Sequence, residues 1–481
     1  MNLPKQVQEI LEKVYKSNFQ IYIVGGAVRD LILDREVKDW DFTADAKPEE
    51  ILKIFPDGFY NNKFGTVGIP IRDLSEVGGA EESSQNVSQT LIKDIESKDS
   101  FKIPKRQDPK LSPQIFEITT MRKEGDYKDH RHPVKVSWTD KIEEDLGRRD
   151  FTINALALDK NLKIIDPFDG QADLKAKLIK AVGDPNKRFQ EDALRLIRAV
   201  RIASELDFTI EEKTALAIQK NALLIKQIAW ERIRDELFKI LGSANPYLGL
   251  IKLREVKLLQ EILPELEKCF GIVQEGPKHD RIYDIGDHSL RSLKECPGID
   301  PLVRLAALLH DVGKPATVKI AKDGNVTFYN HDVVGGKIVL EIAKRFNLSK
   351  SQTDKLYKLV RWHLFSVSEN QTDAAIRRFI KNVGLENIDD LLAVRVADRL
   401  GGDTRKPVSW RMEKFQDRIQ QVLKKPFSIT DLKVNGNDVM KILNIKPSKK
   451  VGEILKKLFQ EVLADSNKNE KEYLLQRIKE L

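Results

Sequence analysis

The sequence contains very little cysteine, with only Cys269 and Cys296 among its 481 residues. The two are not spaced as a pair, which excludes a disulfide framework and a cysteine-rich zinc site. Such scarcity is typical of proteins in a reducing compartment, so we expect a cytoplasmic location. The sequence also lacks an apolar run of the ~18 residues that a bilayer span needs, and its start lacks a signal-peptide core. We therefore expect a soluble protein with no membrane partner.

The chain carries a small excess of positive charge. Charged residues make up 32% of the sequence, hydrophobic residues make up 41%, and the formal net charge is +8. The apolar content is sufficient for packed cores, and 481 residues predict several domains. A modest basic excess is compatible with a polyanionic partner such as a nucleic acid.

The front of the chain predicts a small α+β unit over residues 1–140. Residues 1–18 have the apolar spacing of an amphipathic helix. The runs IYIVGG, WDFTA, TVGIPI and FEITTM predict short strands, and AVRDLIL predicts a helix. Residues 73–112 are polar, poor in aromatics and without periodicity, which predicts a mobile inserted loop. An alternative is an RNA-contacting arm that uses Lys102, Lys105 and Arg106.

The rest of the chain predicts helices. EDALRLIRAVRIASEL and AWERIRDELFKILG have apolar residues at steps of three and four. We divide this part into a helical neck and body over 141–275, a histidine-bearing helical region over 276–404, and a lysine-rich helical tail over 405–481. The tail could contact RNA phosphates, and a solvated helical bundle is the alternative.

Two aspartates in the front unit predict a magnesium site. Strand side chains alternate between faces, so Asp39 and Asp41 in KDWDFTA have the spacing of two carboxylates on one face. Glu117 in FEITTMR is placed to add a third carboxylate from another strand. Nucleotidyl transfer needs such carboxylates to hold Mg²⁺ between a triphosphate and an attacking hydroxyl.

A glycine pair upstream predicts a phosphate contact. Gly25 and Gly26 link a predicted strand to a predicted helix, where backbone N–H groups can approach an anion. Arg29 can add a charged clamp to this turn. A glycine pair alone is more often only a turn, and a lone Asp-x-Asp is more often a solvated strand end. Their order and short separation favour the joint interpretation.

Seven motifs in this order resemble the bacterial class II CCA-adding tRNA nucleotidyltransferase/poly(A) polymerase family. They are GGAVRDLIL, DWDF, FEITTMRKEGDYKDHRHP, EEDLGRRDFTINALA, DPFDGQADL, RFQEDALRLIRAVRIASEL and ERIRDEL. The resemblance implies a polymerase β-type nucleotidyltransferase sheet followed by an all-α neck. It also implies template-independent addition and repair of the 3′-terminal CCA of tRNA from CTP and ATP, with release of pyrophosphate. Arg149 would contact the nucleotide, the alternative being an exposed arginine at a helix start.

Four polar residues recur at steps of three, a spacing that predicts one stripe along a helix. They are Asp192, Arg195, Arg198 and Arg201, and we predict that they select the base. Cytosine and adenine both present an amino donor beside a ring-nitrogen acceptor. Asp192 would accept from the amino group and Arg195 would donate to the ring nitrogen. Arg198 and Arg201 would face phosphate. The alternative is a salt-bridged surface helix.

The choice between related activities depends on residues 125–133. Their sequence, GDYKDHRHP, resembles the loop that full CCA-adding members keep, although Arg131-His132 replaces a common pair of arginines. The segment NNKFGTVGIPI also resembles CCA-adding rather than poly(A)-adding members. A poly(A) polymerase and a partial CC- or A-adding enzyme remain the alternatives. The sequence does not distinguish a monomer from a homodimer.

A second group of residues predicts a metal centre behind the neck. Imidazole and carboxylate ligands suit a divalent metal such as Mn²⁺, Ni²⁺ or Mg²⁺, and the candidates in chain order are His288, His310, Asp311, His331, His363 and Asp398. HDVGKP resembles the HD phosphohydrolase superfamily, which implies metal-dependent hydrolysis of phosphoesters such as 2′,3′-cyclic phosphates. The resemblance implies His288, His310, Asp311 and Asp398 as core metal ligands, with His331 and His363 serving a second metal or a phosphate. One alternative is a retained fold without activity, and another is an HD-type phosphohydrolase with a tRNA-binding head. His279 fits no ligand position.

Overall fold

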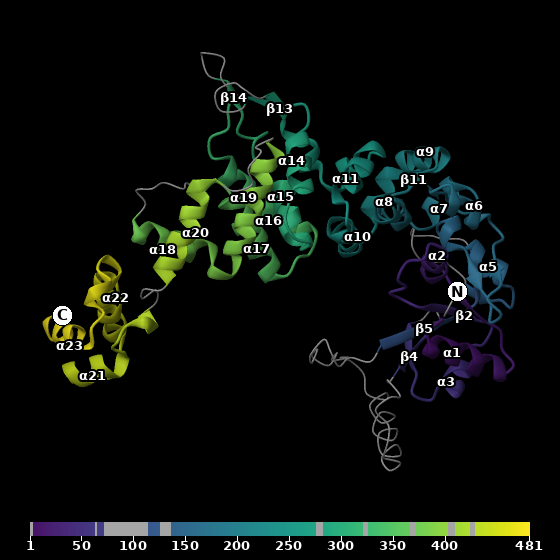
Figure 1. Cartoon of the computed structure of the whole chain (residues 1–481), viewed down its shortest axis with the longest axis horizontal. Coiled ribbons are helices and arrows are strands. Elements are labelled where there is room, and N and C mark those ends of the chain that lie inside the picture. Colours follow the sequence, from purple (N-terminus) through teal and green to yellow (C-terminus); the bar gives the residue numbers. More distant parts are fainter. Residues whose placement is uncertain are drawn as a thin grey trace, which may run out of the picture. The chain divides into compact units, whose positions relative to one another are not determined.

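The computed structural model describes residues 3–62, 65–71, 114–125, 136–275, 282–320, 326–365, 372–402, 409–423 and 429–481. The chain forms two compact units, one of 1–203 and 207–227, the other of 204–206 and 228–481 (Figure 1). The predicted insertion 73–112, the loop residues 126–133 and His279 lie outside the described residues. The predicted division into four domains therefore stays a proposal.

A seven-stranded sheet forms the centre of the first unit. Its strand order is β3-β4-β5-β2-β1-β8-β9. Only β2 and β5 run parallel, and the other neighbours are antiparallel. The strands of this sheet are β1 (Ile21–Val24), β2 (Asp41–Ala44), β3 (Phe59–Asn62), β4 (Thr66–Ile71), β5 (Gln114–Thr120), β8 (Ala157–Leu158) and β9 (Ile164–Ile165).

Helices and two small strand pairs complete the first unit. The helices are α1 (Lys5–Lys16), α2 (Gly26–Ile32), α3 (Pro48–Ile54), α5 (Ile142–Gly147), α6 (Gly170–Lys175), α7 (Pro185–Glu191), α8 (Leu194–Leu206) and α9 (Glu212–Asn221). A 3₁₀ turn, η2 (Thr152–Asn154), follows α5. The small pairs are β6 (Arg122–Glu124) with β7 (Val136–Trp138), and β10 (Leu178–Ile179) with β11 (Thr209–Ile210).

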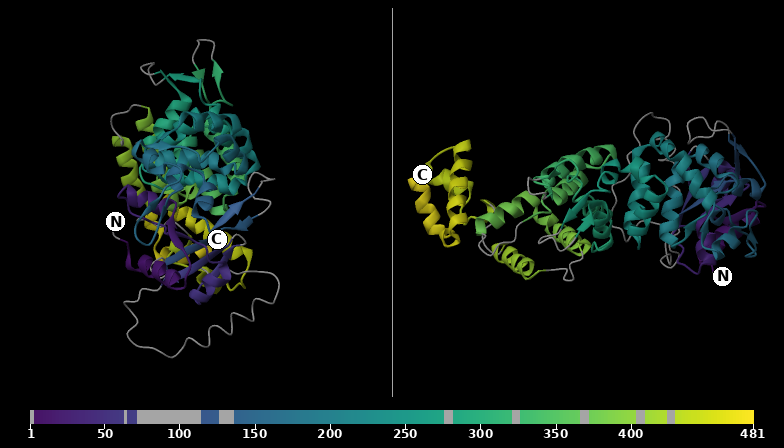
Figure 2. Two further views of the ribbon diagram at one scale, coloured as in Figure 1. Left: turned by 90° about the vertical axis from the view of Figure 1, so that its right-hand side faces the viewer. Right: turned by 90° about the horizontal axis from the view of Figure 1, so that it is seen from above.

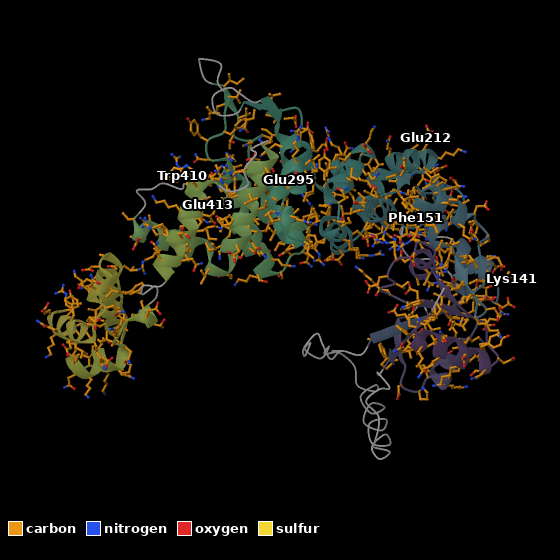
Figure 3. All side chains as sticks on the ribbon, in the orientation of Figure 1. Lys141, Phe151, Glu212, Glu295, Trp410 and Glu413 are labelled. Atoms are coloured by element: carbon orange, nitrogen blue, oxygen red, sulfur yellow. The ribbon has the colours of Figure 1, made fainter. Side chains whose placement is uncertain are left out.

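The alternation of β5 shows why the sheet can present polar groups. Phe116 and Ile118 are buried, whereas Glu117 between them is exposed, as expected for a strand with one covered face. The Phe116 ring packs 5.9 Å from the Phe42 ring of β2. Elsewhere in this unit, Phe151 is fully buried and Lys141 is exposed; both are labelled in Figure 3. The buried apolar residues of β5 thereby leave Glu117 on the opposite face of the strand.

The second unit is helical. Its helices are α10 (Trp230–Gly242), α11 (Pro246–Glu255), α12 (Leu259–Ile262), α13 (Pro264–Glu267), α14 (Ile285–Lys294), α15 (Pro301–Leu309), α16 (His331–Arg345), α17 (Lys350–Arg361), α18 (Asp373–Val383), α19 (Ile388–Gly401), α20 (Trp410–Leu423), α21 (Gly436–Leu443), α22 (Lys449–Ala464) and α23 (Lys471–Glu480), coloured teal to yellow in Figure 2. Two short hairpins join β12 (Val273–Glu275) to β13 (Ile282–Asp284) and β14 (Lys319–Ile320) to β15 (Val326–Thr327).

Helix α15 leads directly into two of the predicted metal ligands. The side chain of its N-cap, Asp300, accepts a hydrogen bond from the backbone N–H of Leu302, and Pro301 occupies the first turn. Every residue from Leu302 to Leu309 is buried, and all of them are apolar except Arg304, whose guanidinium donates to the carbonyl of Ser243 at 2.8 Å. His310 and Asp311 follow the carboxyl end of this helix, and both are buried.

The predicted fold class, α+β with an N-terminal sheet and helical regions behind it, is confirmed. The strands predicted in WDFTA, TVGIPI and FEITTM are β2, β4 and β5, and the first predicted helix is α1. One prediction of local structure is wrong. Asp192 does not share a helix with Arg195, because its backbone is extended (φ −138°, ψ 106°) between α7 and α8. In the described part of the chain, no helix is long and apolar enough to cross a bilayer.

Candidate functional site

The parallel pair of strands places two of the predicted carboxylates opposite each other. Asp41 of β2 is the register partner of Glu117 of β5, and both residues are exposed. Asp39 lies two residues before Asp41, ahead of the first residue of β2. The prediction that both aspartates lie within one strand is therefore only half correct. The register places Asp41 opposite Glu117, but in the described residues the ligand atoms of the three carboxylates do not all lie within 4.8 Å of one another, as those of the histidine groups of the second unit do.

Negative charge is concentrated around Asp41. Partial burial raises the pKa of its carboxyl, the Arg149 guanidinium lowers it, and the charges of Glu117 and Asp39 raise it again. The net pKa lies above the usual value, because desolvation and two like charges outweigh the cationic neighbours. A divalent cation would relieve this repulsion. The available donors are carboxylate oxygens, which are the ligands that Mg²⁺ prefers.

The glycine turn lies directly against this acidic cluster. Gly25, at the N-cap of α2, has φ of 72°, which favours glycine. A Cβ at this position would lie 2.8 Å from Nη1 of Arg149 and 3.9 Å from Oδ2 of Asp41. A side chain there would displace the arginine. At Gly26, a Cβ would lie 3.6 Å from Nη2 of Arg29.

Arg29 is held by its own neighbours. Its Nε and Nη2 donate to the two carboxylate oxygens of Asp30, each at 2.9 Å, and its Nη1 donates to Oδ1 of Asn154 at 3.0 Å. The bidentate pair fixes the plane of the guanidinium beside the glycine turn. The contact of Arg29 with phosphate stays a prediction. These hydrogen bonds would hold the guanidinium in place for it.

Three of the five N–H groups of Arg195 bond to the protein in the described part of the chain. Its Nη1 donates to the carbonyl of Arg188 at 3.0 Å and to Glu191 at 2.9 Å, and its Nη2 donates to the carbonyl of Arg148 at 2.9 Å. A guanidinium has five donors, so these contacts account for three of them. The contact with the Arg148 carbonyl links the predicted base-reading residue to the segment that carries Arg149.

Asp192 is oriented by the start of α8. Its Oδ1 accepts a hydrogen bond of 3.0 Å from the backbone N–H of Leu194. Its backbone carbonyl accepts from the N–H of Arg195 at 3.1 Å. The two predicted base-reading residues are thus joined by a tight turn rather than by a helical stripe. Arg198 and Arg201 lie one and two steps of three residues further along α8.

The histidines and aspartates of the second unit form one buried group. Oδ2 of Asp311 lies 3.1 Å from Nε2 of His310 and 3.6 Å from Nε2 of His288. Oδ1 of the same carboxylate lies 3.2 Å from Nε2 of His331 and 3.8 Å from Nε2 of His363. Asp311 therefore lies between two histidine pairs, and each pair can form a metal-binding group with it.

Backbone carbonyls orient three of these imidazoles in the same way. Nδ1 of His310, His331 and His363 lies 2.8, 2.8 and 2.7 Å from a carbonyl oxygen three residues earlier. This contact fixes the tautomer with the proton on Nδ1, so that Nε2 offers a lone pair. The Nε2 atoms of His331 and His363 are buried and make no hydrogen bond within the described ranges. Unpaired lone pairs beside a carboxylate fit a divalent metal.

Asp398 and an unpredicted lysine complete this group. Oδ1 of Asp398, on α19, lies 3.2 Å from Nε2 of His288. The buried Lys314 donates to Oδ2 of Asp311 at 2.6 Å and to the side chain of Gln274 at 2.5 Å. The structure thus brings together all six predicted ligands. Lys314 could have been found from the sequence, because it follows Asp311 by three residues in HDVGKP.

Comparisons with known proteins agree with the arrangement of the first unit. The family described as Poly A polymerase head domain matches residues 21–77 and 72–180. Probable RNA and SrmB-binding site of polymerase A matches 207–270, and tRNA nucleotidyltransferase domain 2, putative, matches 341–478. The CCA-adding enzyme of Ligilactobacillus salivarius is 31% identical over 484 residues, covering 100% of this chain and 98% of that protein.

This chain belongs to the tRNA nucleotidyltransferase/poly(A) polymerase family. Another relative, the A-adding tRNA nucleotidyltransferase of Deinococcus radiodurans, is 35% identical over 329 residues, covering 66% of this chain and 74% of that protein. Among solved structures, the Bacillus stearothermophilus CCA-adding enzyme in complex with CTP has a TM-score of 0.65 at 25% identity. That comparison covers 100% of this chain and 98% of the other. The family predicted from seven motifs is confirmed.

Arg198 of α8 forms an ion pair with Asp150 inside the first unit. Its Nε and Nη2 donate to Oδ2 of Asp150 at 2.8 and 2.6 Å. The other oxygen of Asp150 accepts from Asn154 at 3.1 Å and from the backbone of Phe151 at 2.9 Å. Burial opposes ionisation of Asp150, but Arg198 and these donors hold its pKa far below the usual range.

Replacing Arg198 by methionine is expected to destabilise the protein by ~3 kcal/mol at neutral pH. The change leaves the Asp150 carboxylate buried without its cation, and the value is at the low end because Arg198 is one-third exposed. Since the pKa of Asp150 is depressed in the folded state, the pair stabilises above the unfolded pKa of ~3.9 and less as pH falls below it. The loss should therefore shrink in acid.

Urea unfolding at pH 7 and pH 3 measures this difference. Lys5→Met serves as the control, because Lys5 pairs with Glu9 at 3.7 Å on an exposed helix surface, where a change of under ~0.5 kcal/mol is expected. Equal stability of the Arg198→Met variant and the parent at pH 7 would show that the pair contributes nothing.

Proposed function

We propose that this protein adds and repairs the 3′-terminal CCA of tRNA, using CTP and ATP and releasing pyrophosphate. The observation that carries the proposal is the pairing of Asp41 with Glu117, with Asp41 and Arg149 both beside the Gly25 turn. The similarity to CCA-adding enzymes of several bacteria supports tRNA as the substrate. The absence of a membrane-spanning helix in the described ranges is compatible with the proposed cytoplasmic location.

The chemistry would centre on Asp39, Asp41 and Glu117. Mg²⁺ held by these carboxylates would activate the 3′-hydroxyl of tRNA and neutralise charge on the departing pyrophosphate. The carboxylates themselves set where the cation sits, because β2 and β5 hold Asp41 and Glu117 in one register pair. Arg149 and Arg29 border the glycine turn and would bind the triphosphate there, with Gly25 and Gly26 leaving room for it.

Base choice would come from Asp192 and Arg195. The Asp192 carboxylate accepts from the exocyclic amino group of cytosine or adenine, and Arg195 donates to the ring nitrogen. Uracil and guanine present an acceptor to the carboxylate and a donor to the guanidinium. Buried polar groups would then be left unpaired, at a cost of ~1–3 kcal/mol per group. Arg198 and Arg201 would face the phosphates, although the Asp150 pair occupies Arg198 in this structure.

Replacing Asp192 by alanine is expected to relax discrimination against UTP and GTP by about 10- to 100-fold, since one mismatched buried group costs ~1–3 kcal/mol. Activity with CTP should fall less than the discrimination does. The measurement is kcat/KM for each of the four nucleotides on one tRNA. Glu212→Ala, at an acidic residue in the first turn of α9, is the control. Unchanged discrimination in the Asp192 variant would contradict base reading by this residue.

Incorporation of each nucleotide alone, on tRNA ending before, within and after CCA, tests the whole proposal. We expect CMP to be added twice, AMP once, and nothing beyond the complete end. Addition of AMP only to tRNA that ends in CC would indicate an A-adding enzyme like the Deinococcus radiodurans relative. Addition of CMP only would indicate a CC-adding enzyme, and repeated addition of AMP a poly(A) polymerase. No incorporation at all would overturn the proposal.

We also propose a metal-dependent phosphohydrolase in the second unit, acting on phosphoesters such as 2′,3′-cyclic phosphates of damaged tRNA ends. The observation that favours it is the buried Asp311 between two histidine pairs, in one of which, His331 and His363, the buried Nε2 atoms make no hydrogen bond within the described residues. A divalent cation held there, Mn²⁺, Ni²⁺ or Mg²⁺, would lower the pKa of a bound water. His288, His310, Asp311 and Asp398 would be the core metal ligands, and His331 and His363 would bind a second metal or a phosphate.

The proposed division of labour follows the predicted regions. Residues 1–140 carry the transfer chemistry, 141–275 the base selection and RNA binding, and 276–404 the hydrolase. Residues 405–481 would contact tRNA. Part of this tail has an apolar core of its own, formed by residues that include Val439, Leu458 and Leu474. Whether the protein acts as a monomer or a homodimer is a question that solution measurements decide.

A further inference from the structure

A fully buried aspartate outside the predicted site lies beside two adjacent arginines. Asp145, on α5, has no exposed surface. Its Oδ1 accepts hydrogen bonds from Nε of Arg148 at 2.9 Å and from the backbone N–H of Arg122 at 3.2 Å. Its Oδ2 lies 3.6 Å from Nη2 of Arg149. Each carboxylate oxygen therefore faces a different guanidinium.

The oxygen that faces Arg149 has no other polar partner. Oδ2 of Asp145 is buried and makes no hydrogen bond in the described part of the chain. A buried carboxylate oxygen that is left unbonded costs free energy unless a nearby charge compensates it. Among the described residues, the guanidinium of Arg149 pairs with that oxygen at 3.6 Å, whereas that of Arg148 pairs with Oδ1. The arrangement stabilises Arg149 in one position.

The other end of the Arg149 guanidinium lies at the acidic cluster. Its Nη1 lies so close to the glycine turn that a Cβ on Gly25 would come within 2.8 Å of it, and the same Cβ would lie 3.9 Å from Oδ2 of Asp41. Arg149 thus spans the distance from Asp145 to the turn beside Asp41. The Asp145 carboxylate at one end of the Arg149 guanidinium and the Asp41 carboxylate near its other end fix the orientation of this side chain.

The neighbouring arginine is held away from Arg149 by a second carboxylate. Nη1 of Arg148 lies 3.5 Å from Oε1 of Glu124, and that oxygen also pairs with Nη2 of Arg122 at 2.8 Å. Arg148 lines a pocket of about 210 Å³ together with Glu124, whereas Arg149 does not. Two adjacent cations repel each other, and the carboxylates of Glu124 and Asp145 offset this repulsion, while both arginine side chains stay 19% exposed.

We propose that Asp145 is a positioning residue for nucleotidyl transfer, holding Arg149 against the Gly25 turn so that the guanidinium meets the triphosphate of the incoming nucleotide. This proposal rests on the proposed function, in which Arg149 contacts the nucleotide. Asp145 touches no substrate. It acts through Arg149, and the nucleotide-binding geometry is therefore prepared before the nucleotide arrives.

Steady-state kinetics of Asp145→Asn tests the proposal. The amide keeps the shape of the side chain but removes its charge, so KM for CTP and ATP should rise about 10- to 100-fold, as expected for a misplaced contact. KM for tRNA should stay within about twofold. The matched control is Glu143→Gln on the same helix, where the side chain is exposed and KM for nucleotide should not change.

A double-mutant cycle with Arg149→Met separates positioning from a general structural role. If Asp145 acts through Arg149, adding Asp145→Asn to the Arg149→Met variant should change kcat/KM by less than about twofold. Effects that multiply, or a parent-like KM for nucleotide in Asp145→Asn, would overturn the proposal. If Arg149→Met alone has no effect, the nucleotide-binding role of Arg149 in the proposed function fails instead.

A charge-conserving variant covers the case in which Asp145→Asn does not fold, as judged by circular dichroism. Asp145→Glu keeps the carboxylate but moves it by one methylene. We expect it to raise KM for nucleotide several-fold, and this rise should be absent in the Arg149→Met background. A parent-like KM in Asp145→Glu, or an equal rise in both backgrounds, would overturn the proposal.

Discussion

Replacing Asp41 by asparagine is expected to lower the rate of nucleotide incorporation by more than about 10³-fold, in line with the loss of an essential group in a transfer site. Asparagine keeps the shape of the side chain but removes one negative charge. The cation would lose the ligand that faces Glu117 in the register of β2 and β5. The measurement is single-turnover addition of CMP to tRNA that lacks its end.

Binding of tRNA should be nearly unaffected by the Asp41 change, because removing an exposed carboxylate takes away no contact with phosphate. Filter binding of tRNA to the variant provides that comparison. Asp57→Asn is the matched control, since Asp57 is an exposed aspartate of the same unit and its variant should add CMP at the parent rate. Native-rate extension by the Asp41 variant would refute the assignment of the acidic cluster.

Replacing Asp311 by asparagine is expected to abolish metal-dependent phosphohydrolysis, with a fall of more than about 10²-fold. The two oxygens of Asp311 serve both histidine pairs, so one substitution affects both groups. It also leaves the Lys314 ammonium, which lies 2.6 Å from Oδ2, without its counter-charge. This ammonium would then repel an incoming cation.

Hydrolysis of a 2′,3′-cyclic nucleotide, measured with Mn²⁺, Ni²⁺ and Mg²⁺ in turn, gives the result. Bound metal, measured on the same samples, should fall together with hydrolysis, while CMP addition to tRNA should stay within about twofold. Asp354→Asn on α17 is the control, because Asp354 is an exposed residue that pairs with Lys358 of the same helix. A parent protein that hydrolyses nothing with any of the three metals would refute the hydrolase and leave the transferase untouched.

The sequence predicted the residues of both sites better than it predicted their surroundings. Side-chain alternation in WDFTA and FEITTM predicts which positions face out, and β2 and β5 then bring Asp41 opposite Glu117. Histidines are rare enough that their grouping signalled the second site, and all of the predicted ligands converge there. Backbone carbonyls that orient imidazoles, such as that of Ala307, cannot be read from residue identity.

The prediction of one helical stripe through Asp192 and Arg195 failed because a periodic spacing does not reveal a break in the helix. Asp192 and Arg195 are three residues apart, yet α7 ends at Glu191 and α8 begins at Leu194. The backbone bond from Arg195 to Asp192 preserves the spacing across the turn.

Asp145 was missed for a related reason. Acidic residues in the first turn of a helix are ordinarily solvated partners of the helix dipole, and EED at the start of α5 looks like three of them. Only packing shows that the third is buried with two arginines.

The pairing of β4 with β5 bears on how the first unit tolerates changes in chain length. These strands pair antiparallel from Thr66 with Thr119 to Ile71 with Gln114, so the chain leaves and rejoins the sheet at directly opposed positions. Hairpins of this kind close with turns of two to five residues. Everything between Ile71 and Gln114 could accordingly be exchanged for a short turn without shifting Glu117 relative to Asp41, which makes this junction a natural place for deletion, grafting or a reporter fusion.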